Sequence, residues 1–146
     1  MNYSIEKLSK HDNLLGLIGY PLSHSFSKGY FAKKFKEEDI PGWFYESFPL
    51  TEARHFKQLF ERLPNLRGIN VTLPYKEQVI PFLDELEKGA AEIGAVNTIK
   101  RVGDRLLGFN TDVYGFQQSL VEKMNESGLT FKGALILGTG GAAKAV

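Results

Sequence analysis

Hydroxyl, amide, ammonium and carboxylate side chains gather in four short segments, each standing where a strand would end or a loop begin. The segments are Ser23–Ser27, Asn70–Lys76, Ala95–Thr98 and Asn110–Asp112. In an open α/β sheet the carboxyl ends of the strands line the crevice that binds ligand. We therefore expect these side chains to converge on one small polar molecule.

Each candidate also has a simpler explanation when it is taken alone. Ser25 or Ser27 suits the N-cap of the helix that follows. Lys76 suits an exposed helix lysine. Asp112 suits a first-turn acid that complements a helix dipole, and Asn97 a hairpin residue bonded to its own backbone.

A glycine-rich loop stands at the end of the sequence. The apolar segment Gly133–Leu137 predicts a strand that leads into the loop, and a helix should follow it. The loop residues are Gly138, Thr139, Gly140, Gly141, Ala142 and Ala143. Glycines there allow a tight turn and let backbone N–H groups approach a dinucleotide pyrophosphate. The pattern alone does not distinguish a dinucleotide site from an ordinary strand-to-helix turn, because small residues are common in such turns.

Alternating strands and helices predict an α/β fold with a mostly parallel sheet flanked by helices. Apolar or aromatic runs predict strands at Leu14–Ile18, Trp43–Phe48, Leu66–Leu73, Ala95–Arg101 and Arg105–Phe109. Helical spacing predicts helices at Lys28–Asp39, from an N-cap at Thr51 to Leu63, at Tyr75–Ile80, at Pro81–Ile93 and from Val113 to a stop at Asn125–Gly128. We expect residues 1–128 to form one domain and residues 129–146 to begin a second, Rossmann-type domain.

The dipeptide Gly103-Asp104 predicts a tight hairpin turn. If Val102 faces Arg105, then Ile99 faces Gly108 and Asn97 faces Asn110. Cross-strand neighbours lie about 5 Å apart, so this register brings Asn97 close to Asp112.

Composition limits the classes of function. The chain has 146 residues, a net charge of +1 and no cysteine. Without a block of like charge, nucleic acid is not expected as a partner. No metal site and no membrane span are expected, and the polar N-terminus lacks the apolar stretch of a signal peptide. These features favour a cytoplasmic protein.

The combination of motifs resembles the shikimate dehydrogenase family over nearly the whole chain. The motifs are Gly19-x-Pro21-x-x-His24-Ser25-x-Ser27, Asn70-Val71-Thr72-x-Pro74-x-Lys76, Gly94-Ala95-Val96-Asn97-Thr98, Gly108-x-Asn110-Thr111-Asp112 and the loop from Gly138 to Ala142. The resemblance implies NADP-dependent interconversion of 3-dehydroshikimate and shikimate, in the route to chorismate and the aromatic amino acids.

The resemblance also implies roles for particular residues. Ser25 and Ser27 would hold the substrate carboxylate, while Thr72, Asn97 and Asp112 would bond the ring hydroxyls. Lys76, paired with Asp112, would be the acid–base residue. Such chemistry suits the reaction, because hydride arriving at a ketone creates an alkoxide that an ammonium can stabilise and protonate. The loop residues Gly138, Thr139, Gly140, Gly141 and Ala142 would bind NADP.

The sequence departs from the family pattern in three places. Lys28 stands where a proline is common, and Tyr20 where an asparagine is frequent. The rest of the dinucleotide domain would lie beyond Val146, so we expect the chain to be an N-terminal fragment, inactive alone.

Two alternatives stay open: a dehydrogenase for quinate or another ring polyol acid, and a non-enzymatic module that binds small molecules. The sequence does not indicate an oligomeric state.

Overall fold

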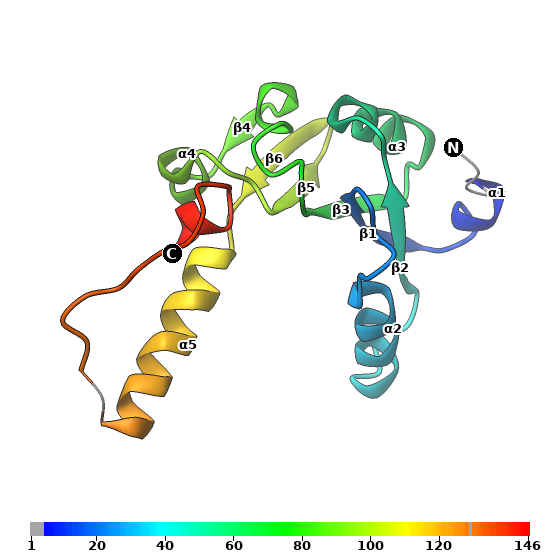
Figure 1. Cartoon of the computed structure of the whole chain (residues 1–146). Helices are drawn as coiled ribbons and strands as arrows, with labels where there is room; N and C mark the ends of the chain where they lie inside the picture. The colour runs from blue at the N-terminus through cyan, green and yellow to red at the C-terminus, as the bar shows by residue number, and fades with distance from the viewer. Residues whose placement is uncertain (1–4, 129) are drawn as a thin grey trace.

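The computed structural model describes residues 5–128 and 130–146. Within them, one sheet of six strands forms the body of the protein, in the order β2-β1-β3-β5-β6-β4 (Figure 1). The strands are β1 (Asn13–Gly19), β2 (Trp43–Pro49), β3 (Leu66–Val71), β4 (Glu85–Leu86), β5 (Thr98–Val102) and β6 (Arg105–Phe109). β1 runs parallel to β2 and β3, and β4 parallel to β6, whereas β5 runs antiparallel to both neighbours. The predicted α/β fold with a largely parallel sheet and one hairpin is confirmed.

Helices flank this sheet. They are α1 (Ile5–Leu8), α2 (Ser27–Glu37), α3 (Phe56–Arg62), α4 (Lys88–Ile93) and α5 (Asp112–Ser127), with short 3₁₀ turns η1 (Ala53–His55), η2 (Ile80–Phe82) and η3 (Ala143–Ala145). The predicted N-cap at Thr51 is wrong. Glu52 is the extended residue before η1, and its side chain makes no capping hydrogen bond.

The core lies between the sheet and α3. Leu14 and Ile18 of β1 are fully buried. Phe56, Leu59 and Phe60, three and four residues apart, are buried on one face of α3, as their spacing predicts. Burying each such side chain contributes about 1.5–3 kcal/mol, so this packing anchors the strands whose ends carry the polar residues.

The two helices predicted between Tyr75 and Ile93 are wrong in part. Turns replace the first, and the second is split: the backbone becomes extended at Leu83 and forms β4 before α4 begins. β4 pairs with β6, Glu85 facing Leu107. Periodicity missed this strand because it is short, and its pairing depends on a segment far along the chain.

The hairpin register is confirmed. Val102 faces Arg105 and Ile99 faces Gly108. The turn residue Gly103 has a positive φ of 59°, a conformation that favours glycine. β5 and β6 therefore deliver Asn97 and the start of α5 to the same end of the sheet.

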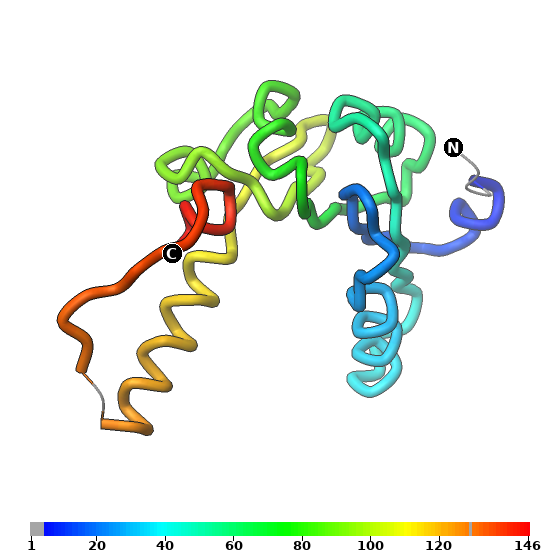
Figure 2. Tube along the Cα trace, in the orientation of Figure 1, coloured from blue at the N-terminus to red at the C-terminus, as the bar shows by residue number. Residues whose placement is uncertain are grey.

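α5 ends as predicted, with Gly128 in the left-handed conformation at its C-cap. The helix projects away from the sheet, and the following segment returns beside α4 without joining the sheet (Figures 1 and 2). The α5 side chains Phe116, Leu120 and Val121 are exposed. Within the described residues, no helix combines the length and apolar character needed to cross a membrane.

The strand predicted at Gly133–Leu137 does not form. The segment pairs with none of the described strands, and Leu135 and Leu137 are 85% and 87% exposed. A strand needs a neighbour to satisfy its backbone groups, and none of the described strands runs beside this one. The helix expected after the loop is also absent from the described residues, where the short turn η3 stands instead.

Candidate functional site

Lys76 and Asp112 form an ion pair beyond the ends of β3 and β6. The Lys76 Nζ lies 2.5 Å from Asp112 Oδ2, and the two side chains are 13% and 36% exposed. Val96 N–H donates to the Lys76 carbonyl over 2.7 Å, which fixes the backbone of the turn. Lys76 is therefore not an ordinary exposed lysine, and its charge faces a carboxylate.

Asn97 holds the other oxygen of the same carboxylate. Its Nδ2 donates to Asp112 Oδ1 over 2.7 Å and to Thr111 Oγ1 over 2.9 Å. Its Oδ1 accepts from the Thr111 N–H over 3.0 Å and from the Thr98 hydroxyl over 3.0 Å. The buried amide thus links β5 to the first turn of α5, and both Asp112 oxygens have a protein donor.

The backbone around Asp112 is fixed as well. Asn110 Nδ2 donates to the Ala95 carbonyl over 3.0 Å, and its Oδ1 accepts from the Asp112 N–H over 3.0 Å. Asp112 is the acid in the first turn of α5, so the helix-dipole explanation holds alongside its pairing with Lys76. We name Lys76, Asn97 and Asp112 the lysine cluster.

Ser25, Ser27 and Thr72 line a depression of about 590 Å³ between the β1–α2 loop and the end of β3. A Cβ on Gly19 would lie 2.5 Å from Thr72 Cγ2, so glycine lets the two loops approach closely. α2 begins at Ser27 without a capping side chain, although Ser25 Oγ accepts from the Ser27 N–H over a long 3.4 Å. The N-cap explanation therefore does not account for these serines.

The structure thus brings the predicted substrate residues into two groups, the lysine cluster and the depression lined by the two serines and Thr72. Thr72 and Lys76 join the groups, because they lie on the same loop after β3. Hydroxyl donors at one end suit a carboxylate, and an ammonium beside a carboxylate at the other end suits proton transfer.

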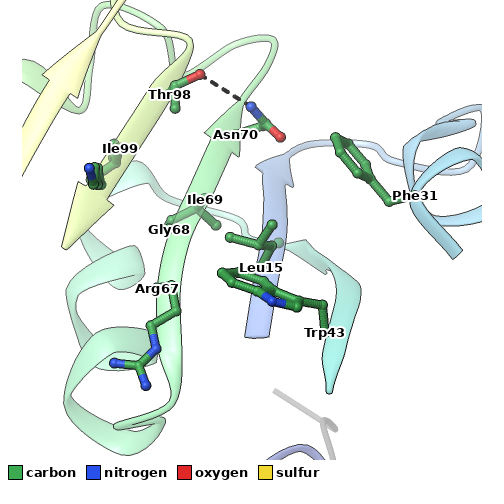
Figure 3. A pocket seen from close by; sticks show the side chains of 11 residues that line it. Leu15, Phe31, Trp43, Arg67, Gly68, Ile69, Asn70, Thr98 and Ile99 are labelled. Atoms are coloured by element: carbon green, nitrogen blue, oxygen red, sulfur yellow. Dashed lines mark hydrogen bonds between the residues drawn. The ribbon is translucent and has the colours of Figure 1, made fainter. Parts of the chain in front are cut away.

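Three polar residues on the sheet face beside the site received no individual role in the sequence analysis. Tyr45 O–H donates to Asn70 Oδ1 over 2.9 Å, and Asn70 Nδ2 donates to Thr98 Oγ1 over 3.2 Å, the bond drawn in Figure 3. Asn70 and Thr98 stood in the recognised motifs without a role. No local signal marked Tyr45, whose partners lie on other strands.

The glycine loop lies against the turn that carries Lys76. A Cβ on Gly141 would lie 3.1 Å from both Lys76 Cβ and Ala95 Cβ, and Lys144 Nζ lies 2.9 Å from Glu77 Oε2. Gly138 has a φ of 123°, which glycine alone adopts readily. The flanking strand and helix of a dinucleotide site are not formed, so Gly138–Ala142 do not make a complete NADP site in the described residues.

These features define the class of protein: an α/β domain with a cluster of polar side chains beyond the carboxyl ends of parallel strands. Comparison with known families identifies it further. The shikimate dehydrogenase substrate binding domain matches residues 17–99. The chain belongs to this family.

Individual relatives agree with this assignment. A shikimate dehydrogenase (NADP(+)) of Halothermothrix orenii is 45% identical over 138 residues, which are 91% of this chain and 46% of the relative. The solved shikimate dehydrogenase of Aquifex aeolicus is 39% identical with a TM-score of 0.79, over 92% of this chain and 50% of that one.

A third relative was solved with ligands bound. Shikimate 5-dehydrogenase of Thermus thermophilus, in complex with NADP(H) and shikimate, is 37% identical with a TM-score of 0.76, over 92% of this chain and 50% of that one. The chain spans about half the length of each of these relatives.

Proposed function

We propose that this chain functions in an NADP-dependent shikimate dehydrogenase. In this proposal residues 1–128 form the substrate-binding domain, and residues 129–146 begin the dinucleotide-binding domain. The reaction interconverts shikimate and 3-dehydroshikimate. The observation that carries the proposal is the partly buried Lys76–Asp112 pair beside a depression lined by hydroxyls. Family membership and the relatives named above support the same reaction.

The hydroxyls of Ser25 and Ser27 bind the substrate carboxylate in this proposal. Neutral donors suit an anion that must also leave as product, because an arginine clamp would bind substrate and product alike with little gain in rate. Thr72, Asn97 and Asp112 bond the ring hydroxyls. Asn97 does so by exchanging one of its present protein bonds for a bond to the substrate.

Lys76 transfers the proton to and from the substrate oxygen in this proposal. In the direction of ketone reduction its ammonium donates a proton to the oxygen that gains negative charge, and in the reverse direction its amine accepts the proton of the alcohol. Asp112 orients the lysine through the ion pair. NADP carries the hydride in this family's reaction, and Gly138, Thr139, Gly140, Gly141 and Ala142 are the residues we assign to it. They do not form a complete site by themselves.

Shikimate titration of the 146-residue chain, followed by calorimetry and by NMR, tests the binding half of the proposal. We expect saturable binding that shifts resonances of the serine loop and of Asn97, because those residues are the proposed contacts of the substrate. We also expect no NADP-dependent oxidation of shikimate by this chain, since the dinucleotide site is incomplete. Absence of shikimate binding, or robust oxidation, would contradict these expectations.

Quinate is the alternative substrate, because the serine and lysine groups can serve another ring polyol acid equally well. A parallel quinate titration discriminates: tighter binding of quinate than of shikimate would favour this alternative. A module that binds a ligand without catalysis is the second alternative. The Lys76–Asp112 pair favours an enzyme, because binding alone does not require an acid–base group.

A further inference from the structure

A continuous series of hydrogen bonds crosses the sheet and ends at the lysine cluster. Tyr45 on β2 donates to Asn70 on β3, which donates to Thr98 on β5. The Thr98 hydroxyl donates to Asn97 Oδ1, and Asn97 donates to Asp112. We name Tyr45, Asn70, Thr98 and Asn97 the polar file.

Every donor in the polar file points toward the Asp112 carboxylate. Hydrogen bonds that run in one direction polarise one another, so each bond received makes the next donor stronger. Asn97 uses both of its N–H groups and two lone pairs of its oxygen within the protein. The Thr98 hydroxyl therefore helps to fix the orientation of Asn97 together with Thr111 and Asp112, and this hydroxyl in turn accepts from Asn70.

Tyr45, at the end of the polar file farthest from Asp112, is held in place by burial and ring stacking. Its side chain is 3% exposed, and its ring stacks on Phe31 with centroids 4.4 Å apart and planes 9° apart. Burial raises the pKa of Tyr45, while a hydrogen bond with the Ser27 side chain lowers it in part. Tyr45 stays protonated at neutral pH, so it acts as a hydroxyl donor. The file therefore begins beside a serine assigned to the substrate carboxylate.

We propose that Tyr45 and Thr98 are positioning residues, which act through the polar file to hold Asn97 and Asp112 in the orientation that Lys76 needs. Neither touches the Lys76–Asp112 pair directly. The catalytic meaning of this inference rests on the proposed function, whereas the hydrogen-bonded file can be tested without turnover.

The test uses four variants of the 146-residue chain. Tyr45→Phe and Thr98→Val remove one hydroxyl each and keep the packing, and Thr98→Ser keeps the hydroxyl. Tyr30→Phe is the matched control, because Tyr30 also packs its ring on Phe31 but is exposed and outside the file. The readouts are the NMR resonances of the Asn97 side-chain amide and the Kd for shikimate.

Tyr45→Phe and Thr98→Val should shift the Asn97 amide protons upfield, because the amide loses polarisation through its oxygen. Thr98→Val should weaken shikimate binding by roughly 2- to 10-fold, the contribution of an ordinary hydrogen bond. Because Tyr45 also bonds the Ser27 side chain, the Asn97 resonances alone test the polar file in Tyr45→Phe. Thr98→Ser and Tyr30→Phe should leave both readouts close to those of the unmodified chain.

Unchanged Asn97 resonances in Tyr45→Phe and Thr98→Val would overturn the inference. So would an equal response of Thr98→Ser and Thr98→Val, which indicates a packing role. If Tyr45→Phe fails to fold, the serine and valine pair at position 98 decides. If the unmodified chain binds no shikimate while the Asn97 shifts appear as expected, the proposed function fails and the polar file stands.

Discussion

The two ends of the proposed substrate site are built differently. In the lysine cluster both Asp112 oxygens and the whole Asn97 amide are hydrogen-bonded within the protein. At the serine loop, Ser25 Oγ accepts one long bond from the Ser27 N–H, the Ser27 side chain has Tyr45 as its partner, and the intervening Phe26 is 88% exposed. The first end is prearranged and the second is open. The protein therefore fixes the residues proposed to transfer the proton more firmly than those proposed to bind the substrate carboxylate.

Removing the Lys76 ammonium from the lysine cluster should have the largest effect, and this effect should be on kcat. In a form of the protein that carries a complete dinucleotide domain, Lys76→Ala should lower kcat by a factor of roughly 10² or more, the usual contribution of a general acid–base group, and change KM less. Steady-state kinetics with shikimate and NADP measures it. Lys88→Ala, at an exposed lysine of α4, is the control. A kcat close to that of the unmodified enzyme would reduce Lys76 to a binding residue.

Removing a hydroxyl from the open end should affect binding instead. Ser27→Ala should raise the Kd of the 146-residue chain for shikimate by about 10-fold, because a hydrogen bond to a charged carboxylate is lost. Calorimetry measures it, with Ser119→Ala on the exposed face of α5 as the control. If Ser27→Ala and Ser119→Ala bind shikimate equally well, the carboxylate does not lie on the serine loop.

The smallest effect should come from Tyr45 at alkaline pH. Its folded pKa is raised by burial above the ordinary value of 10.0, so the unfolded chain loses this proton first as pH rises. The stability that the neutral hydroxyl contributes is fully present below pH 10.0 and is lost at higher pH. In Tyr45→Phe the free energy of unfolding should therefore fall less steeply as the pH rises above 10.0. Urea denaturation at several pH values measures this. An identical slope in both proteins would contradict this.

Local patterns predicted much of the fold. Gly103-Asp104 set the hairpin register, and apolar spacing located α2, α3 and α5. β4 was missed because a strand of two residues has no period to detect. The strand at Gly133–Leu137 was predicted from its apolar residues, but strand formation requires a partner that no local pattern supplies.

The candidate site was predictable in a similar way. Spacing and the family motifs marked Lys76, Asn97 and Asp112, and the hairpin register explained why Asn97 approaches Asp112. Tyr45 escaped notice, because its role depends on a diagonal reach across β1 to Asn70 on β3. Contacts between strands distant in sequence leave no period or motif within one segment.

The close approach of Gly141 to Lys76 restricts which residues fit at position 141. Even a methyl group at position 141 would meet Lys76 Cβ at 3.1 Å, tighter than ordinary packing allows. Substitutions in the glycine loop are therefore coupled to the residue proposed to move the proton. A side chain at position 141 would therefore have to displace the turn that carries Lys76, which lies 65 positions earlier in the sequence.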